Sequence, residues 1–125
     1  MARNTRQREA IRQVFKDSDH PLGPEEVLER AQDLVPGMGI ATVYRNVKRL
    51  SETGWLAPVE LPGTSLRYEL AARPHHHHFV CRACDRAFDV QACPPRVEEL
   101  APGGFVVETH EVILYGRCPA CAGSP

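Results

Sequence analysis

The sequence predicts an α+β fold, in which a winged helix-turn-helix domain over residues 1–72 precedes a small α/β dimerisation domain over residues 73–125. Three observations predict this division. Residues 5–53 carry apolar side chains at helical spacing, and two short segments typical of strands follow them. The stretch Ala-Ala-Arg-Pro, residues 71–74, is typical of a short hinge, and two Cys-x-x-Cys pairs lie beyond it.

Composition allows a hydrophobic core and limits where a nucleic acid could bind. The 125 residues are 42% apolar and carry a net charge of −1, so a DNA-binding surface must be local. Basic side chains are concentrated in residues 1–16, where the only acidic residue is Glu9. No apolar run has the length of a signal peptide or membrane span, so we expect a cytoplasmic protein without a membrane partner. In that reducing compartment, the five cysteines favour metal binding over disulfides.

Three helices are predicted in the first domain. The first covers residues 5–17, and the second begins at Pro24, which suits the first turn of a helix, and ends before residues 36–39. The third covers residues 40–53 and is ended by Gly54. The inward-facing residues are expected to be Ala10, Ile11, Val14, Phe15, Val27, Leu28, Ala31, Leu34, Val43, Val47 and Leu50.

The third helix and the segment after it predict a DNA reader. A last helix that exposes Thr, Tyr and Arg near its start is typical of helix-turn-helix proteins, although a bundle with a solvated basic face fits the same pattern. Predicted strands at 55–61 and 65–70, joined by a turn at 62–64, favour the DNA reader because a hairpin in this position is a wing. The outward-facing candidates are Thr42, Tyr44, Arg45, Lys48 and Arg49 on the helix, with Arg67 on the wing for phosphate contact.

The second domain is predicted to contain strands at 77–80, 87–90 and 105–115, with a weak helix at 95–100. About fifty residues bury too little core to be stable alone, so we expect a metal site and a dimer interface to contribute.

Two cysteine pairs predict a tetrahedral zinc site. Cys81 and Cys84 form one pair, and Cys118 and Cys121 form the other. The intervening residues 85–117 exceed the roughly 15–20 of a compact zinc ribbon, so they must hold structure of their own. Two disulfides, or iron bound by four cysteines, fit the same spacing. Cys93 remains, and we expect it to be structural or inert, with a redox role as the alternative.

Four consecutive histidines, residues 75–78, precede the first cysteine pair. Side chains alternate faces along a strand, so His76 and His78 share one face and His75 and His77 share the other. A His-x-His pair on a strand is a bidentate metal ligand, and a solvated polar edge is the alternative interpretation.

Several of these segments together resemble the ferric uptake regulator family of metal-dependent repressors. They are Ile-Ala-Thr-Val-Tyr-Arg-Asn (40–46), Arg-Tyr-Glu-Leu (67–70), the His-Cys segment (75–84) and Tyr-Gly-Arg-Cys-Pro-Ala-Cys (115–121), and the likeness covers nearly the whole chain. The resemblance implies a homodimeric repressor that binds an inverted repeat in double-stranded DNA and controls metal-homeostasis or peroxide-stress genes. It implies no small-molecule substrate; a zinc-dependent enzyme and a zinc-stapled interaction module are the rival hypotheses.

The resemblance also implies roles for individual residues. The structural zinc ligands would be Cys81, Cys84, Cys118 and Cys121. The regulatory ligands would be Glu69, His76, His78 and Asp89, with His20 as a fifth. A further site would use His75, His77 and His110, with Glu98 or Glu99. Tyr44 and Arg45 would contact bases, and Arg3 would reach the minor groove.

The chemistry of the regulatory ligand set predicts the sensed metal. Nitrogen and oxygen ligands without a thiolate suit Fe(II) or Mn(II), and zinc sensing is the alternative. The family's peroxide-sensing branch has Asp at the position of Asp89, so peroxide sensing through bound Fe(II) is a further expectation. Because Glu69 and His20 come from the first domain, a metal that also binds the second domain would fix the angle between the two.

Overall fold

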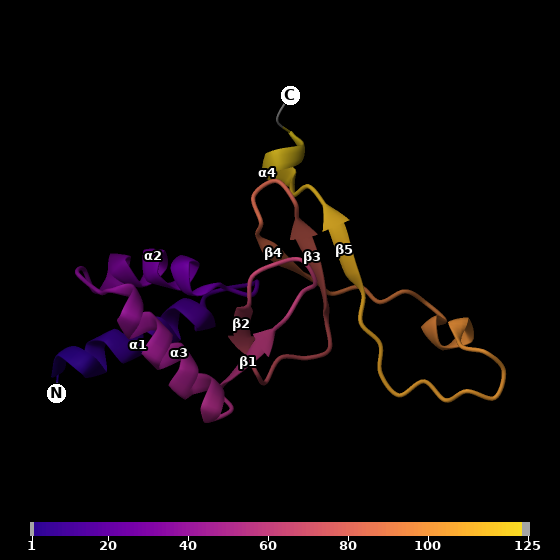
Figure 1. Ribbon diagram of the computed structural model, residues 1–125, viewed down its shortest axis with the longest axis horizontal. Helices are drawn as coiled ribbons and strands as arrows, with labels where there is room; N and C mark the ends of the chain where they lie inside the picture. The colour runs from indigo at the N-terminus through magenta and orange to yellow at the C-terminus, as the bar shows by residue number, and fades with distance from the viewer. Residues whose placement is uncertain (1, 124–125) are drawn as a thin grey trace. The chain divides into compact units, whose positions relative to one another are not determined.

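The computed structural model describes residues 2–123, with side chains from residue 4 onward (Figure 1). The chain divides into two compact units, Met1–Arg73 and Pro74–Pro125. No helix in the described range is long and apolar enough to cross a membrane.

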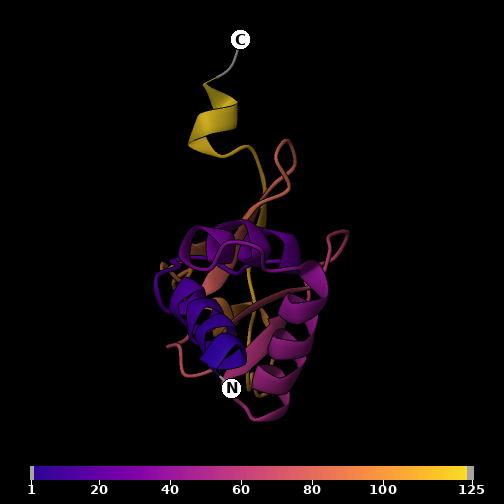
Figure 2. The same cartoon turned by 90° about the vertical axis from the view of Figure 1, so that its left-hand side faces the viewer.

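The first unit contains three helices and a hairpin (Figure 2). The helices are α1 (Ala2–Lys16), α2 (Pro24–Leu34) and α3 (Ile40–Glu52). Helix α1 begins three residues before the predicted start at Thr5, because nothing in the preceding residues breaks the helix. The core of the unit comprises Ala10, Ile11, Val14, Phe15, Leu22, Val27, Ala31, Met38, Val43, Val47, Leu50 and Leu56.

Two glycines position α3, the helix that carries the predicted DNA-binding residues. Gly39 caps its start in an extended conformation and accepts a hydrogen bond from the N–H of Val43. Gly54 follows its end with φ of +83°, a left-handed conformation that glycine adopts at little cost. One predicted core residue is wrong: Leu34, the last residue of α2, is half exposed, and Val35 packs on the core instead.

The hairpin consists of β1 (Leu56–Val59) and β2 (Arg67–Leu70), paired antiparallel with Leu56 opposite Leu70. Both strands are shorter than predicted. The backbone of Leu22 bonds to Tyr68 in both directions, with N–O distances of 2.9 Å, and so ties the hairpin to the segment that follows α1. Because Leu22 is itself fully buried, the wing is fixed to the helical core.

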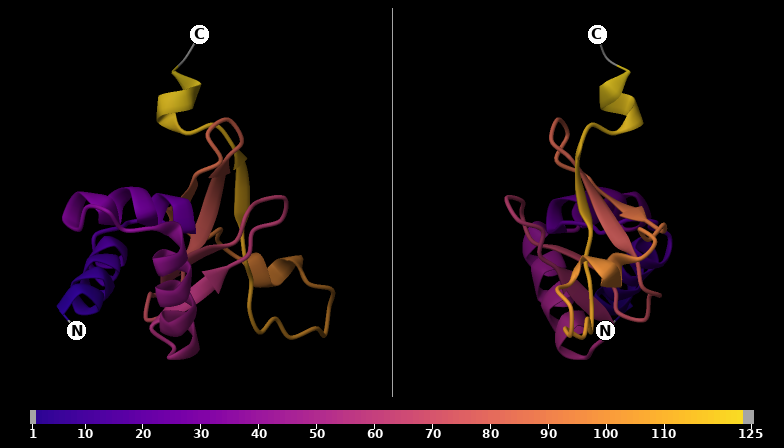
Figure 3. Two further views of the ribbon diagram at one scale, coloured as in Figure 1. Left: turned by 60° about the vertical axis from the view of Figure 1, so that its left-hand side comes forward. Right: turned by 90° about the vertical axis from the view of Figure 1, so that its right-hand side faces the viewer.

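The second unit is built on a three-stranded sheet in the order β4-β3-β5 (Figure 3). The central strand β3 (His77–Cys81) pairs antiparallel with β4 (Ala87–Val90) and parallel with β5 (Ile113–Gly116). A 3-10 helix, η1 (Val97–Leu100), lies in the connection between β4 and β5, and a short helix, α4 (Pro119–Ala122), follows β5.

The predicted strand over residues 105–115 is mostly wrong. Only its last three residues belong to β5, and residues 105–112 form no strand, although the structure describes all of them. Pairing with β3 begins at Ile113, so the preceding residues have no partner strand within the chain. Phe105 and Val106 are consequently 69% and 86% exposed. The predicted helix at 95–100 is confirmed only as the single turn η1.

Candidate metal centres and DNA-binding face

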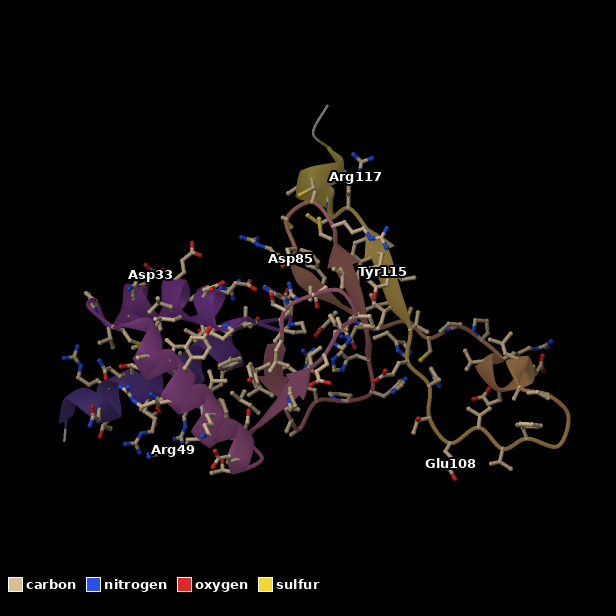
Figure 4. All side chains as sticks on the ribbon, in the orientation of Figure 1. Asp33, Arg49, Asp85, Glu108, Tyr115 and Arg117 are labelled. Carbon is tan, nitrogen blue, oxygen red and sulfur yellow. The ribbon has the colours of Figure 1, made fainter. Side chains whose placement is uncertain are left out.

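Four cysteines converge in the second unit, where the yellow sulfur atoms gather beside α4 (Figure 4). Parallel pairing of β3 with β5 places Cys81 opposite Gly116, so the chain returns Cys118 and Cys121 to the first cysteine pair. All four sulfurs lie within 4.8 Å of one another.

The sulfur geometry fits one tetrahedral ion. The Cys84 and Cys118 sulfurs are 3.9 Å apart. A zinc ion with metal–sulfur bonds of about 2.3 Å separates its sulfurs by about 3.8 Å, whereas a disulfide joins them at about 2.05 Å. All five cysteines of the chain are free thiols, so the structure favours a metal over the disulfide alternative.

Backbone hydrogen bonds prepare one of these cysteines as a thiolate. The N–H groups of Cys118 and Cys84 donate to the Cys81 sulfur over 3.3 and 3.4 Å and lower the pKa of Cys81 to about 6. The Cys118 and Cys81 sulfurs in turn raise the pKa of Cys121 to about 12. Without a cation, one thiolate therefore suppresses the ionisation of its neighbours, and a central divalent ion would remove that suppression.

A second group of potential ligands lies on one face of the β3–β4 pair. His78 is directly opposite Asp89 in the register, and the His76 Nε2 atom lies 3.9 Å from a carboxylate oxygen of Asp89. The His76 Nδ1–H donates to the carbonyl oxygen of Pro74 over 2.8 Å, which orients the imidazole ring. Three nitrogen and oxygen ligands therefore share one face, as the alternation of the histidine run predicts.

The first unit carries the other two predicted regulatory ligands, Glu69 and His20. Glu69 is on β2, and its carboxylate lies 4.0 Å from Arg73. His20 is buried among charged groups of its own unit: Nδ1–H donates to Asp19 over 2.9 Å, and Nε2 lies 3.5 Å from both Glu26 and Arg30.

These contacts do not test whether His20 is a fifth regulatory ligand, which stays a prediction. Its pKa is raised by the hydrogen bond to Glu26, and burial only partly opposes this shift. The Nδ1–H is directed at the Asp19 carboxylate, while Nε2 faces both the Glu26 carboxylate and the Arg30 guanidinium, which can only donate. The family resemblance alone suggested its role, and no pattern revealed Asp19 and Glu26 as its partners.

The His20–Glu26 contact gives the first unit a pH dependence. Because the pKa of His20 is raised in the folded state, its stabilising contribution is complete below about pH 6.5 and declines as pH rises through the folded pKa. The free energy of unfolding should therefore decrease above that pH. Fluorescence of Trp55, the single tryptophan, would follow unfolding in urea, and Glu26→Gln should flatten the slope. A slope that is unchanged in Glu26→Gln would contradict this assignment.

The opposite face of β3 holds a third group, His75, His77, Cys93 and His110, whose ligand atoms also lie within 4.8 Å of one another. The three histidines are those predicted, but Glu98 and Glu99, on η1, are not in the group. Cys93 takes the expected place of a carboxylate. Cys93 was not predicted to be a ligand, because it lies in an irregular segment before η1 and belongs to no Cys-x-x-Cys or His-x-His pattern.

The predicted DNA-reading face lies on α3. Tyr44 is 53% exposed, and Arg45, Lys48 and Arg49 are exposed along the same helix, with Arg49 labelled in Figure 4. The Arg45 guanidinium donates to the hydroxyl of Thr42 over 3.2 Å, which holds its planar group near the start of the helix. A polar hollow of about 170 Å³ between α1 and α3 is lined by Asn4, Gln7, Arg8, Thr42, Arg45, Asn46 and Arg49.

The other two predicted DNA contacts, Arg67 and Arg3, are not part of the exposed face of α3. Arg67 is only 3% exposed, and its guanidinium donates to the carbonyl of Ser65 over 3.1 Å. Arg67 therefore cannot reach phosphate as predicted, because its side chain supports the wing from within. The side chain of Arg3 lies outside the described residues.

Comparisons with known proteins agree with this arrangement. The model of the ferric uptake regulator family matches residues 1–115. The ferric uptake regulation protein of Campylobacter jejuni is 31% identical over 124 residues, which cover 94% of this chain and 78% of that protein.

Two solved structures share the fold at similar coverage. A zinc-bound manganese uptake regulator has a TM-score of 0.78 at 27% identity, covering 90% of this chain and 87% of its own. The Helicobacter pylori ferric uptake regulator, described as having three functional metal binding sites, has a TM-score of 0.70 at 25% identity, covering 94% and 81%. Together with the family match over residues 1–115, these likenesses show that the chain belongs to the ferric uptake regulator family.

Proposed function

We propose that this protein is a metal-dependent transcriptional repressor that binds an inverted repeat as a homodimer and senses Fe(II) or Mn(II). Its family comprises metal-responsive, DNA-binding transcription regulators. The observation that carries the proposal is the convergence of His76, His78 and Asp89 on one sheet face. Peroxide sensing through bound Fe(II) is a branch of the proposal, and a zinc-sensing repressor of zinc uptake genes is its alternative.

The ligand chemistry supports the choice of metal. Two imidazoles and a carboxylate contain no thiolate, and this set suits Fe(II) and Mn(II), which accept more than four ligands. Glu69 is proposed as a further carboxylate ligand, supplied by the first unit. His20 is proposed as a fifth ligand, which would exchange its contacts with Asp19 and Glu26 for the metal.

The proposed mechanism couples metal binding to DNA geometry. Glu69 lies at the end of the first unit, close to the hinge residues 71–74. If a metal is bound by Glu69 and by the second unit together, the orientation of the DNA-binding unit becomes restricted. Two copies of α3 in a dimer must lie about 34–36 Å apart, or a multiple of this, to read two half-sites. Metal occupancy would then change DNA affinity by population shift.

Exposed apolar side chains support a dimer formed through the second unit. Leu100, Phe105 and Val106 are 85%, 69% and 86% exposed, and Leu114 on the edge strand β5 is also exposed. A unit of about fifty residues seldom leaves so much apolar surface in water without a partner. A second copy would cover this surface, and two-fold symmetry would match an inverted repeat.

The proposal is tested by measuring DNA affinity against free metal, anaerobically, for Fe(II), Mn(II) and Zn(II) in turn. Fe(II) or Mn(II) should increase affinity for an inverted repeat in the wild type, and Asp89→Ala should remove the increase. Glu108→Ala, an exposed carboxylate in the same unit, serves as the control and should retain it.

Three outcomes would count against parts of the proposal. Activation by zinc at free concentrations far below those of the other metals would replace it with the zinc-sensing alternative. A metal response that persists in Asp89→Ala would place the sensing site elsewhere. Salt-sensitive binding that does not distinguish the repeat from random duplex would argue against a specific repressor.

A further inference from the structure

The third ligand group has an unexpected member. We propose that Cys93 is the fourth ligand of a zinc-type metal site with His75, His77 and His110, and that oxidation of Cys93 releases this ion. This inference does not depend on which metal controls DNA binding, since the group lies on the opposite face of β3 from His76, His78 and Asp89.

The distances within the group match a single tetrahedral ion. The Nε2 atom of His75 lies 3.2 Å from that of His77 and 3.3 Å from that of His110. The Cys93 sulfur lies 3.0 Å from His77 Nε2 and 3.4 Å from His110 Nε2. Zinc bonds of about 2.0–2.1 Å to nitrogen and about 2.3 Å to sulfur give N–N edges of about 3.3 Å and N–S edges of about 3.5 Å.

Hydrogen bonding alone accounts poorly for this cluster. A neutral imidazole has one N–H, and the Nε2 atom of His75 faces the Nε2 atoms of both His77 and His110. A single shared proton can satisfy only one of these two contacts. One cation at the centre would satisfy all four ligand atoms at once.

The donor set also distinguishes this group from the face that binds the proposed regulatory metal. Three imidazoles with one thiolate form a soft set that suits zinc, whereas the His76, His78 and Asp89 set has no sulfur. The chain would therefore place two sites of different metal preference on the two faces of one strand.

Metal binding at His77 should change the hydrogen bonding of Val112, at the start of β5. The N–H of Val112 donates to His77 Nδ1 over 3.0 Å. When Nε2 binds a metal, the ring of a neutral histidine carries its proton on Nδ1, so this hydrogen bond must be given up. Val112 directly precedes β5, and its amide is therefore a local reporter of occupancy.

The ion would hold an otherwise weakly structured segment. Residues 91–112 contain only the single turn η1, and Cys93 and His110 lie near the two ends of this segment. A metal that joins both residues to β3 would close the segment against the sheet.

Cys93 is also placed to lose its ligand function by oxidation. Its side chain is exposed, as is that of Cys84 in the four-cysteine group, whereas Cys81 and Cys118 are buried. A thiolate sulfur attacks one oxygen of hydrogen peroxide, the O–O bond breaks as the S–O bond forms, and sulfur loses two electrons. The departing hydroxide takes a proton from the buffer acid and leaves as water, and the resulting sulfenic acid no longer supplies a thiolate to the metal.

Cobalt provides the first test, on the full-length protein that retains zinc in its four-cysteine site. A further equivalent of Co(II) should bind with tetrahedral visible bands and a thiolate-to-cobalt band in the near ultraviolet, and should shift the Val112 amide resonance. Cys93→Ala should lose the thiolate band and weaken binding at least tenfold. Cys93→Asp should retain bound metal without the thiolate band. Equal cobalt binding and an equal thiolate band in Cys93→Ala would overturn the assignment.

Peroxide provides the second test. One of two zinc ions per wild-type chain should be released, and none should be released from zinc-loaded Cys93→Asp. Trypsin yields the peptide 87–96, in which Cys93 is the only cysteine and no histidine occurs, so an added oxygen there is unambiguous. Release without modification of that peptide, or modification without release, would refute the oxidation step. If Fe(II)- or Mn(II)-dependent DNA binding persists meanwhile, only this inference fails, because Asp89→Ala tests the other site.

Discussion

Replacing Cys81 with serine is expected to release the structural zinc and unfold the second unit. Cys81 is fully buried, and its sulfur receives two backbone N–H groups that bring both cysteine pairs together. Binding of structural zinc contributes about 10–16 kcal/mol in zinc-finger peptides, which is as large as the roughly 5–15 kcal/mol that stabilises whole domains. The dimer should be lost as well, because the exposed apolar residues lie in the same unit.

Zinc content, circular dichroism and size-exclusion chromatography would measure this effect. Trp55 fluorescence should remain native-like, since Trp55 packs against Phe15 in the first unit. Cys93→Ser is the matched control, because it removes a cysteine outside the four-cysteine group and should leave the zinc of that group in place. A folded, zinc-free Cys81→Ser dimer would show that the four sulfurs do not hold a structural ion.

Arg45→Ala is expected to weaken specific DNA binding by about 1–3 kcal/mol, or roughly five- to 150-fold, if the guanidinium contacts guanine through two hydrogen bonds. Thr42 holds the side chain near the start of α3, the part of a recognition helix that enters the major groove. Competition between the specific repeat and random duplex would measure the loss of discrimination.

Lys48→Ala supplies the comparison on the same helix. Lys48 is exposed but lies outside the polar hollow between α1 and α3, so its loss should affect specific and random DNA alike and reduce the salt dependence. If Arg45→Ala weakened binding to both duplexes equally, Arg45 would contact only phosphate.

Predictions from the sequence were most accurate where a regular spacing of residues reflects one physical cause, such as helix periodicity, strand alternation or metal-ligand spacing. The three helices follow from apolar spacing, and Gly54 ends α3 where a left-handed residue is needed. The two faces of the histidine run follow from strand alternation alone. The cysteine group follows from ligand spacing, and the parallel pairing of β3 with β5 shows how residues so distant in sequence meet.

Predictions failed where the outcome depended on contacts that no local pattern encodes. Arg67 was expected to face phosphate because it lies in the wing, but its side chain is 3% exposed. The apolar residues from Phe105 onward were expected to form a strand, but no neighbouring strand within the chain extends to them. Cys93 joined three histidines only because its irregular segment passes the far side of β3.

The parallel pairing of β3 with β5 has a consequence for how the protein acquires its structure. Most helical contacts of the first unit join near neighbours, a low contact order that favours rapid folding. The second unit must bring residues 77–81 against residues 113–116 and so lose the entropy of a long loop before any pairing stabilises it. A zinc ion held by both cysteine pairs closes that same loop, and would thereby act as the nucleus on which the slower unit assembles. Before it folds, the chain can aggregate through its exposed apolar residues. The availability of zinc during synthesis would then govern what fraction of the chains folds before aggregating.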